Sequence, residues 1–180
     1  MQRSHLYELI LTALMTAVIC VLAPLSLPVG PVPVSLGTFA IMLAAIVLGW
    51  KRGVISVLVY LLLGAVGVPV FAGYSAGAAD LVGPTGGYLL GYLPLAVVTG
   101  WFADHYSDKY RLVAGMILGT VVLYALGTVW LAKQLQMTFR EGLATGVIPF
   151  IPGDAAKIVI TVLLGPLMKN TLKKAGYMIR

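Results

Sequence analysis

Long apolar segments separated by short polar connections run along the whole chain of 180 residues. A helix that crosses the ~30 Å hydrocarbon core of a bilayer needs about 20 mainly apolar residues, although tilted or shorter segments occur. Six segments fit this pattern, and the second and third are short: Leu6–Ala23, Leu36–Trp50, Gly53–Val68, Gly86–Ala103, Leu112–Ala132 and Gly153–Leu172. We therefore expect an all-α integral membrane protein, a single domain of six transmembrane helices over residues 1–180.

The first apolar segment also has a feature of a signal peptide, because Arg3 precedes it. It carries Glu8, lacks a clear cleavage site between small residues, and is followed by five further apolar segments. We interpret it as a retained helix.

The connections between the segments differ in length and charge. Three are long and rich in Gly, Pro and aromatic residues, with few charges: Pro24–Ser35, Pro69–Thr85 and Lys133–Pro152. Structureless segments of more than ~12 residues are usually functional or disordered, and this composition argues against disorder. We expect these three connections to pack together over the helices and to cap a ligand pocket that faces outward.

Composition agrees with a membrane protein, because 60% of the residues are hydrophobic, only 10% are charged, and the mean hydropathy is +1.00. The net charge of +6 follows the topology. With six helices, both termini lie on the same side of the membrane. That side holds nine basic residues: Arg3, Lys51, Arg52, Lys109, Arg111, Lys169, Lys173, Lys174 and Arg180. The other side holds two, Lys133 and Arg140. The positive-inside rule therefore places both termini in the cytoplasm, and no nucleic-acid motif accompanies the basic residues.

Two charged residues, Asp154 and Lys157, lie at the start of the last apolar segment in the stretch "FIPGDAAKIVI". Ionisable residues within membrane helices are costly and are functional candidates by default. One interpretation is a capping Asp with a salt bridge to the Lys one turn later. The other is a polar patch that orients a small molecule in an otherwise apolar pocket.

Small residues recur at four-residue spacing, which lets helix backbones approach closely. Ala13 and Ala17 form such a pair in the first segment, which has no polar group suited to a pocket. Packing within the chain and contact with a partner protein both remain open for this pair.

The sequence offers little for catalysis. His5 and His105 lie near the cytoplasmic face, away from Asp154, and there is no HExxH, GxSxG or phosphate-binding loop. The single cysteine, Cys20, can form neither an internal disulfide nor a cysteine-based metal site. We therefore expect no enzyme activity, no metal and no cofactor, and any ATP hydrolysis must occur in another chain.

Four stretches carry a family resemblance: "PVPVS" at 31–35, "GVPVFAGYSAGAADLVGPTGGYLLGY" at 67–92, "GTVWL" at 127–131 and "GVIPFIPGDAAK" at 146–157. They resemble the biotin-specific capture components (BioY) of energy-coupling-factor vitamin importers. The resemblance implies a six-helix protein of the bacterial cell membrane that captures biotin from outside. It also implies two kinds of partner, a transmembrane coupling protein and a pair of ABC-type ATPases.

The resemblance also implies roles for individual residues. The first-helix pair Ala13 and Ala17 corresponds to a pattern that faces the coupling protein. The candidates for contact with biotin are Asp154, Lys157, Tyr88, Phe71, Gly73 and Tyr74, with Thr38 and Trp130 as further candidates. A carboxylate suits the ureido N–H groups of biotin, Lys157 can donate to either the ureido carbonyl or the valerate carboxylate, and aromatic rings can cover the apolar parts.

The chain departs from the family pattern at two places. At the end of the first long connection, Ser35 and Gly37 stand where Thr and Gln are common, so a hydroxyl is kept at position 35 and a side-chain amide is missing at position 37. In the second long connection, Gly77 and Ala78 stand where Gly-Gly is often found.

Three other functions remain as alternatives to biotin capture. They are capture of another vitamin or small solute, a small membrane enzyme with Asp154 and Lys157 as an acid–base pair, and a purely structural membrane protein.

Overall fold

The computed structural model describes residues 2–177, with side chains from Leu6 onward, and it is largely helical. Arg180 and the side chains of Arg3 and His5 lie outside the described part. Residues 2–177 form eight α-helices: α1 (Gln2–Leu22), α2 (Gly37–Leu48), α3 (Trp50–Ala65), α4 (Ala78–Val82), α5 (Gly86–His105), α6 (Lys109–Gln134), α7 (Phe139–Gly146) and α8 (Ile151–Lys174). The other elements are an antiparallel pair of short strands and two 3₁₀ helices: β1 (Ser26–Leu27), β2 (Val34–Ser35), η1 (Ala72–Tyr74) and η2 (Ile148–Phe150).

The helices have the lengths and compositions of a membrane protein. In the described residues, three helical stretches are long and apolar enough to cross a bilayer: Gly86–His105, Lys109–Gln134 and Phe139–Lys174. Leu6–Leu22 and Gly37–Leu48 are apolar but shorter. The expectation of a mostly helical membrane protein is thus confirmed, whereas the count of six spans stays a prediction.

Helix α2 lies at the centre of the bundle. Eleven of its 12 residues are buried, and it packs against α1, α3, α5 and α8. A helix that is apolar on all sides, such as "GTFAIMLAAIVL", has no solvent-compatible face and is stable only when surrounded. The first residues of α2 follow the β1–β2 hairpin, so the hairpin and the core of the bundle are directly connected.

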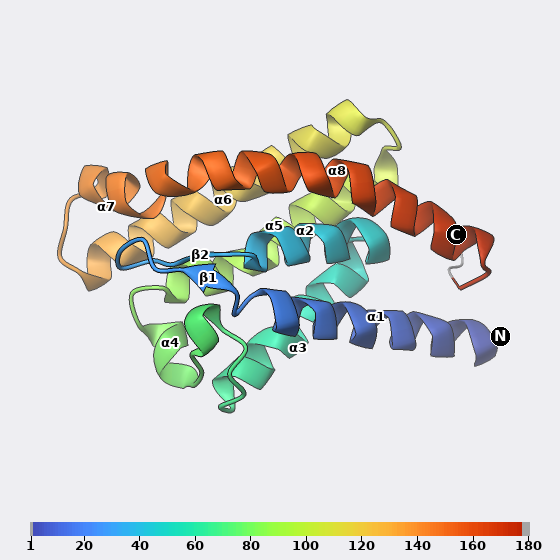
Figure 1. Cartoon of the computed structure of the whole chain (residues 1–180), viewed down its shortest axis with the longest axis horizontal. Helices are drawn as coiled ribbons and strands as arrows, with labels where there is room; N and C mark the ends of the chain where they lie inside the picture. Colours follow the sequence, from blue (N-terminus) through green and yellow to red (C-terminus); the bar gives the residue numbers. More distant parts are fainter. Residues whose placement is uncertain (1, 178–180) are drawn as a thin grey trace.

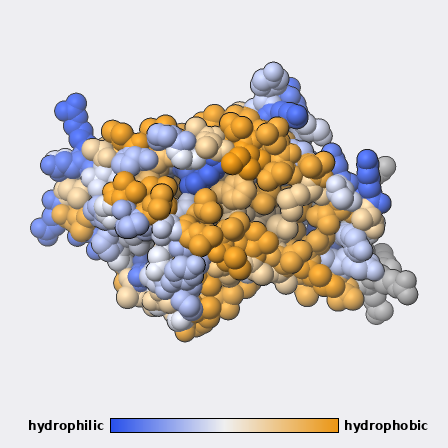
Figure 2. Space-filling model, in the orientation of Figure 1, coloured by the Kyte–Doolittle hydropathy of each residue, from blue (hydrophilic) through white to orange (hydrophobic). Residues whose placement is uncertain are grey.

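The molecule has two unlike ends. The chain termini lie at one end, and the hairpin, α4 and α7 lie at the other (Figure 1). Between the ends the surface is mainly apolar, and polar residues gather toward both ends (Figure 2). This distribution is that of a bundle whose middle section contacts lipid.

The three long connections contain more regular structure than the sequence analysis predicted, because β1–β2, α4 and α7 all lie within them. Helix α7 begins with a capping box, in which Glu141 N–H donates to the Thr138 hydroxyl and Thr138 N–H donates to the Glu141 carboxylate at 2.7 Å. The pattern "TFRE" is the sequence signal of such a start. The connections also meet as expected, since Gly73 N–H donates to the Pro24 carbonyl at 3.0 Å and Val32 packs with Phe150.

Gly49, between α2 and α3, has a backbone that only glycine adopts readily, with φ +79° and ψ 174°. A Cβ atom there would also lie 2.5 Å from both carboxylate oxygens of Asp104. We expect Gly49→Ala to lower the free energy of unfolding by about 1–3 kcal/mol for the strained backbone, and by more than Gly67→Ala because of the collision with Asp104. Thermal unfolding of the purified protein measures this.

Gly67→Ala is the matched control, because Gly67 also has positive φ, +105°, but has no atom within 4 Å of its would-be Cβ. It carries the backbone strain without the collision with Asp104. A Gly49→Ala variant that melts at or above the temperature of Gly67→Ala would contradict the prediction.

Candidate functional site

Asp154 and Lys157 form a buried ion pair at the start of α8. Pro152 occupies the first turn of α8, where the backbone N–H groups have no partner within the helix, so the missing N–H of proline costs nothing. Asp154 lies in the same turn, where its negative charge interacts favourably with the helix dipole. The Lys157 Nζ donates to Asp154 Oδ1 at 2.8 Å. Only 5% of Asp154 and 8% of Lys157 is exposed, so neither charge is screened by water.

The pair is completed by partners from α2 and the hairpin. Lys157 Nζ donates to the Ser35 carbonyl at 2.6 Å and to the Thr38 hydroxyl at 3.1 Å, so its three N–H donors all have partners. The Thr38 hydroxyl donates to Asp154 Oδ1 at 3.2 Å. The Asp154–Lys157 ion pair is therefore tied to the segment that leads from β2 into α2.

Tyr124 holds the second carboxylate oxygen. Its hydroxyl, which comes from α6, donates to Asp154 Oδ2. Its ring stacks at 6.5 Å on Phe150, which immediately precedes α8. The carboxylate is thus fixed from both sides, by Tyr124 on one oxygen and by Lys157 and Thr38 on the other.

Two adjoining hollows lie over this network. The smaller, of ≈ 40 Å³, contains Thr38, Tyr124, Asp154 and Lys157 in its wall, and the larger, of ≈ 220 Å³, reaches Phe71, Asp80 and Thr85. They share wall residues from the first connection and from α5: Val32, Pro33, Ser35, Tyr88 and Tyr92. The walls are therefore aromatic and aliphatic, with the charged network at one end, the usual composition of a small-molecule site.

Five of the predicted contact residues lie in these walls. Asp154, Lys157, Thr38 and Tyr88 line the smaller hollow, and Phe71 and Tyr88 line the larger one. Tyr88 is held by a hydrogen bond from its hydroxyl to the Gly146 carbonyl at 3.1 Å. The structure therefore brings together residues from four separate parts of the sequence.

Gly73, Tyr74 and Trp130 are not brought into these walls. Gly73 is in the left-handed backbone region at φ +72° and ties η1 to Pro24, and Tyr74 is 61% exposed. Trp130 Nε1 donates to the Gly83 carbonyl at 2.8 Å, and its side chain packs on Gly87 at the start of α5. Trp130 thereby positions the helix that carries Tyr88.

The wall residues that the sequence analysis did not predict include two tyrosines and one aspartate. Tyr92 lies one turn after Tyr88 on the same face of α5, and Tyr124 is a polar ring in the middle of an apolar segment. Asp80 lines the larger hollow, and its Oδ2 atom is buried with no hydrogen-bond partner among residues 6–177. The i, i+4 spacing of the tyrosines and the isolated acid in an apolar connection were the available signals.

The unusual Gly37 has a structural explanation. A Cβ at position 37 would lie 2.8 Å from the Tyr92 hydroxyl and 3.1 Å from the Ser35 hydroxyl. Gly37 N–H donates to that Ser35 hydroxyl at 3.1 Å. The space that a side chain at position 37 would fill is thus occupied by Tyr92.

Ala13 and Ala17 lie on an exposed face of α1. Both line a hollow of ≈ 790 Å³ between α1 and α3, whose other wall includes Ile55, Val59 and Leu63. The wall is mainly apolar, with the Glu8–Arg52 ion pair and two threonines of α1 as its polar members. Among the described residues, no group of three His, Cys, Asp or Glu side chains is placed to hold a metal ion.

Comparisons with known proteins agree with this architecture. The model of the BioY family matches residues 1–174. The biotin transporter BioY of Thermotoga maritima is 40% identical over 163 residues, covering 91% of this chain and 96% of the relative, and BioY2 of Lactococcus lactis is 38% identical over 168 residues, covering 92% and 91%. A crystal structure of the S-component for biotin from an ECF-type ABC transporter superimposes with a TM-score of 0.88 at 31% identity, covering 94% of each chain.

Proposed function

The chain belongs to the BioY family, and we propose that it captures biotin at the membrane as the substrate-binding component of an energy-coupling-factor importer. The observation that carries this proposal is the buried Asp154–Lys157 network at one end of an aromatic cavity. The relatives are named as transporters and the structural match is an S-component, so an acid–base enzyme is disfavoured.

The proposed binding site consists of Asp154, Lys157, Thr38, Tyr88 and Phe71, to which the cavity walls add Ser35, Tyr92 and Tyr124. Biotin offers two ureido N–H donors and one carbonyl, and the network offers carboxylate acceptors beside an ammonium donor. The aromatic walls cover the thioether ring and the chain. The walls do not include Gly73, Tyr74 or Trp130, so we assign these three to the scaffold around the site.

The cavities of ≈ 220 and ≈ 40 Å³ are smaller than the ~300 Å³ at which ligand sites usually begin. The hairpin supplies Val32, Pro33 and Ser35 to both of them. A modest outward shift of the hairpin therefore enlarges both at once. We propose that biotin enters by this route, from the end of the bundle opposite the termini.

The proposed topology has six membrane helices, formed by α1, α2, α3, α5, α6 and α8, with both termini in the cytoplasm. The support is the excess of basic residues at the end that carries the termini. The site then faces outward. We propose that the Ala13 and Ala17 face of α1 contacts a transmembrane coupling protein, which links the chain to a pair of ATPases.

Binding of labelled biotin to the purified chain tests the proposed function. We expect unlabelled biotin to displace the label and an excess of other vitamins to leave it bound. Displacement by a different vitamin, with no saturable biotin binding, would assign the chain to that solute instead.

Tyr124→Phe should weaken biotin binding by about three- to tenfold, because loss of one hydrogen bond to a charged group costs roughly 1 kcal/mol or more. Without its donor, Asp154 Oδ2 is free to turn toward Lys157 and away from the ligand. Calorimetric titration with biotin measures the change. Tyr110→Phe is the control on the same helix, since Tyr110 is 85% exposed, and equal affinities in the two variants would refute a role for Tyr124.

A further inference from the structure

A second cavity, of ≈ 660 Å³, lies at the end of the bundle that carries the termini. Its walls come from the end of α2, the start of α3, the end of α5 and the last turns of α8. Lys169, in its wall, is about 18 Å further along α8 than Lys157, at ~1.5 Å per residue. The cavity is therefore separate from the proposed biotin site.

The cavity exists because α2 is short. Its 12 residues span about 18 Å, whereas α5 has 20 residues and α8 has 24. Gly49 then turns the chain into α3, and Trp50 N–H donates to Asp104 Oδ2 at 3.0 Å. The longer helices extend past this turn, so a hollow remains beyond the end of α2.

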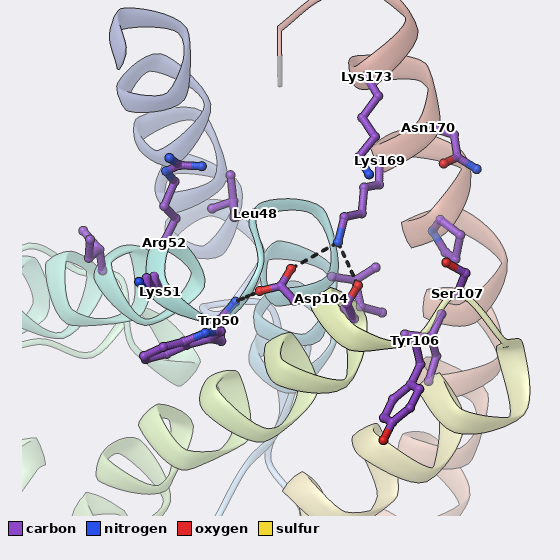
Figure 3. A pocket seen from close by; sticks show the side chains of 15 residues that line it. Leu48, Trp50, Lys51, Arg52, Asp104, Tyr106, Ser107, Lys169, Asn170 and Lys173 are labelled. Atoms are coloured by element: carbon purple, nitrogen blue, oxygen red, sulfur yellow. Dashed lines mark hydrogen bonds and ion pairs between the residues drawn. The ribbon is translucent and has the colours of Figure 1, made fainter. Parts of the chain in front are cut away.

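The walls carry one carboxylate, that of Asp104, and four basic side chains from α3 and α8: Lys51, Arg52, Lys169 and Lys173. Asp104 already accepts from Trp50 N–H and from Lys169 Nζ, the latter at 3.3 Å (Figure 3). Arg52 pairs with Glu8 at 2.5 Å. Lys51 and Lys173 form no ion pair with any side chain between residues 6 and 177, so two positive charges at this cavity are uncompensated.

The remaining wall residues suit an amphiphile. Neutral hydrogen-bonding side chains, Ser107 and Asn170, lie beside the lysines, and the apolar side chains of Ile46, Ile55 and Leu112 line the same hollow. The Asp104 carboxylate caps the N-terminus of α3 through Trp50 N–H, so the free positive charge of the cavity comes from the lysine side chains. Trp50 and Trp101, 37% and 42% exposed, mark this end as an interfacial level.

We propose that this cavity binds the phosphate headgroup of an anionic membrane phospholipid, with Lys51 on the α3 side and Lys173 on the α8 side as the uncompensated cations and the apolar wall against the acyl chains. A phosphodiester carries one negative charge and several acceptor oxygens, which suit an ammonium group and neighbouring neutral donors. Basic pockets between membrane helices are known to suit such headgroups. A soluble anion would leave the apolar wall uncovered.

The test compares lipid retention by the full chain in native mass spectrometry after equilibration with equal amounts of phosphatidylglycerol and phosphatidylcholine. We expect phosphatidylglycerol to be retained at least about fivefold more than phosphatidylcholine, and the double variant Lys51→Gln/Lys173→Gln to lose this preference. The control, Lys109→Gln/Lys174→Gln, removes the same charge from exposed lysines outside the cavity walls and should keep it. Thermal unfolding verifies that both variants are folded.

Three results would overturn the proposal. The first is the absence of any phosphatidylglycerol preference in the wild-type chain, and the second is an equal loss in both double variants, which would indicate general surface charge. The third is displacement of phosphatidylglycerol by millimolar glycerol 3-phosphate, which would identify a site for soluble phosphates. Retention of phosphatidylglycerol in the presence of glycerol 3-phosphate would support a phospholipid as the ligand of this cavity.

Discussion

Lys157→Met is expected to weaken biotin binding at least about tenfold, which corresponds to the loss of one charge-assisted hydrogen bond of ~1.5–3 kcal/mol. Methionine keeps most of the length of the side chain but removes all three N–H donors. The Ser35 carbonyl, the Thr38 hydroxyl and Asp154 Oδ1 then each lose a partner. Asp154 is left as a buried carboxylate without its cation, so the ligand no longer meets both charges.

Asp154→Asn should weaken biotin binding by a similar factor, but here the charge that remains unpaired is the positive charge of Lys157. The amide can still accept from Tyr124 or Thr38, but Lys157 remains buried without an anion. Breaking a buried pair at one partner costs about 3–5 kcal/mol of stability in general, so the thermal unfolding of both variants must be measured together with the calorimetric affinity. Monodisperse variants with unchanged affinity would exclude the pair from the site.

Lys169→Met is the matched control for Lys157→Met. Lys169 is on the same helix and also pairs with a carboxylate, that of Asp104, but it lies at the opposite end of the bundle. It should lower stability without changing biotin affinity. If both lysine variants lost affinity to the same extent, the effect would come from weakening of α8 and not from contact with biotin.

Ala13→Leu combined with Ala17→Leu is expected to reduce biotin uptake at least about tenfold while leaving biotin binding to the purified chain unchanged. Both alanines line the apolar hollow between α1 and α3, and larger side chains there prevent close approach of a partner helix. The smaller hollow that contains Asp154 and Lys157 has no wall residue in common with this hollow. Uptake of labelled biotin by cells that contain the complete importer measures the effect.

Ala125→Leu serves as the control, because Ala125 is an exposed alanine of α6 outside the α1–α3 hollow. It adds the same atoms per substitution to an exposed surface outside that hollow and should leave uptake intact. Normal uptake by the Ala13/Ala17 variant would remove this face from the proposed interface. Loss of biotin binding by that variant would instead indicate a folding defect.

Much of the site could be predicted because charge is rare in this chain. Asp154 and Lys157 are conspicuous in an apolar segment, and their spacing on one helical face already requires a shared environment. Thr38, Tyr88 and Phe71 followed from the family resemblance, and the structure places them in the same cavity walls. The partners that complete the network were less visible, because the Ser35 contact is made by a backbone carbonyl, which no side-chain pattern reveals.

Other features could not be read from spacing. Tyr124 and Trp130 are both aromatic residues of α6, and only the three-dimensional arrangement shows that one holds Asp154 while the other supports Gly83 and Gly87. Helix α7 has a sequence signal at its start, the capping pattern "TFRE", whereas the short strands were hidden within an apolar connection. Tertiary contact, such as that between Val32 and Phe150, determines the conformation there more than local preference does.

The contact between Gly37 and Tyr92 has a consequence for the evolution of the site. A Cβ at position 37 would lie 2.8 Å from the Tyr92 hydroxyl, so we expect epistasis between these two positions. A larger residue at position 37 is compatible with this backbone only if the Tyr92 ring moves or loses its hydroxyl. A substitution at either position therefore changes which residues the other position tolerates.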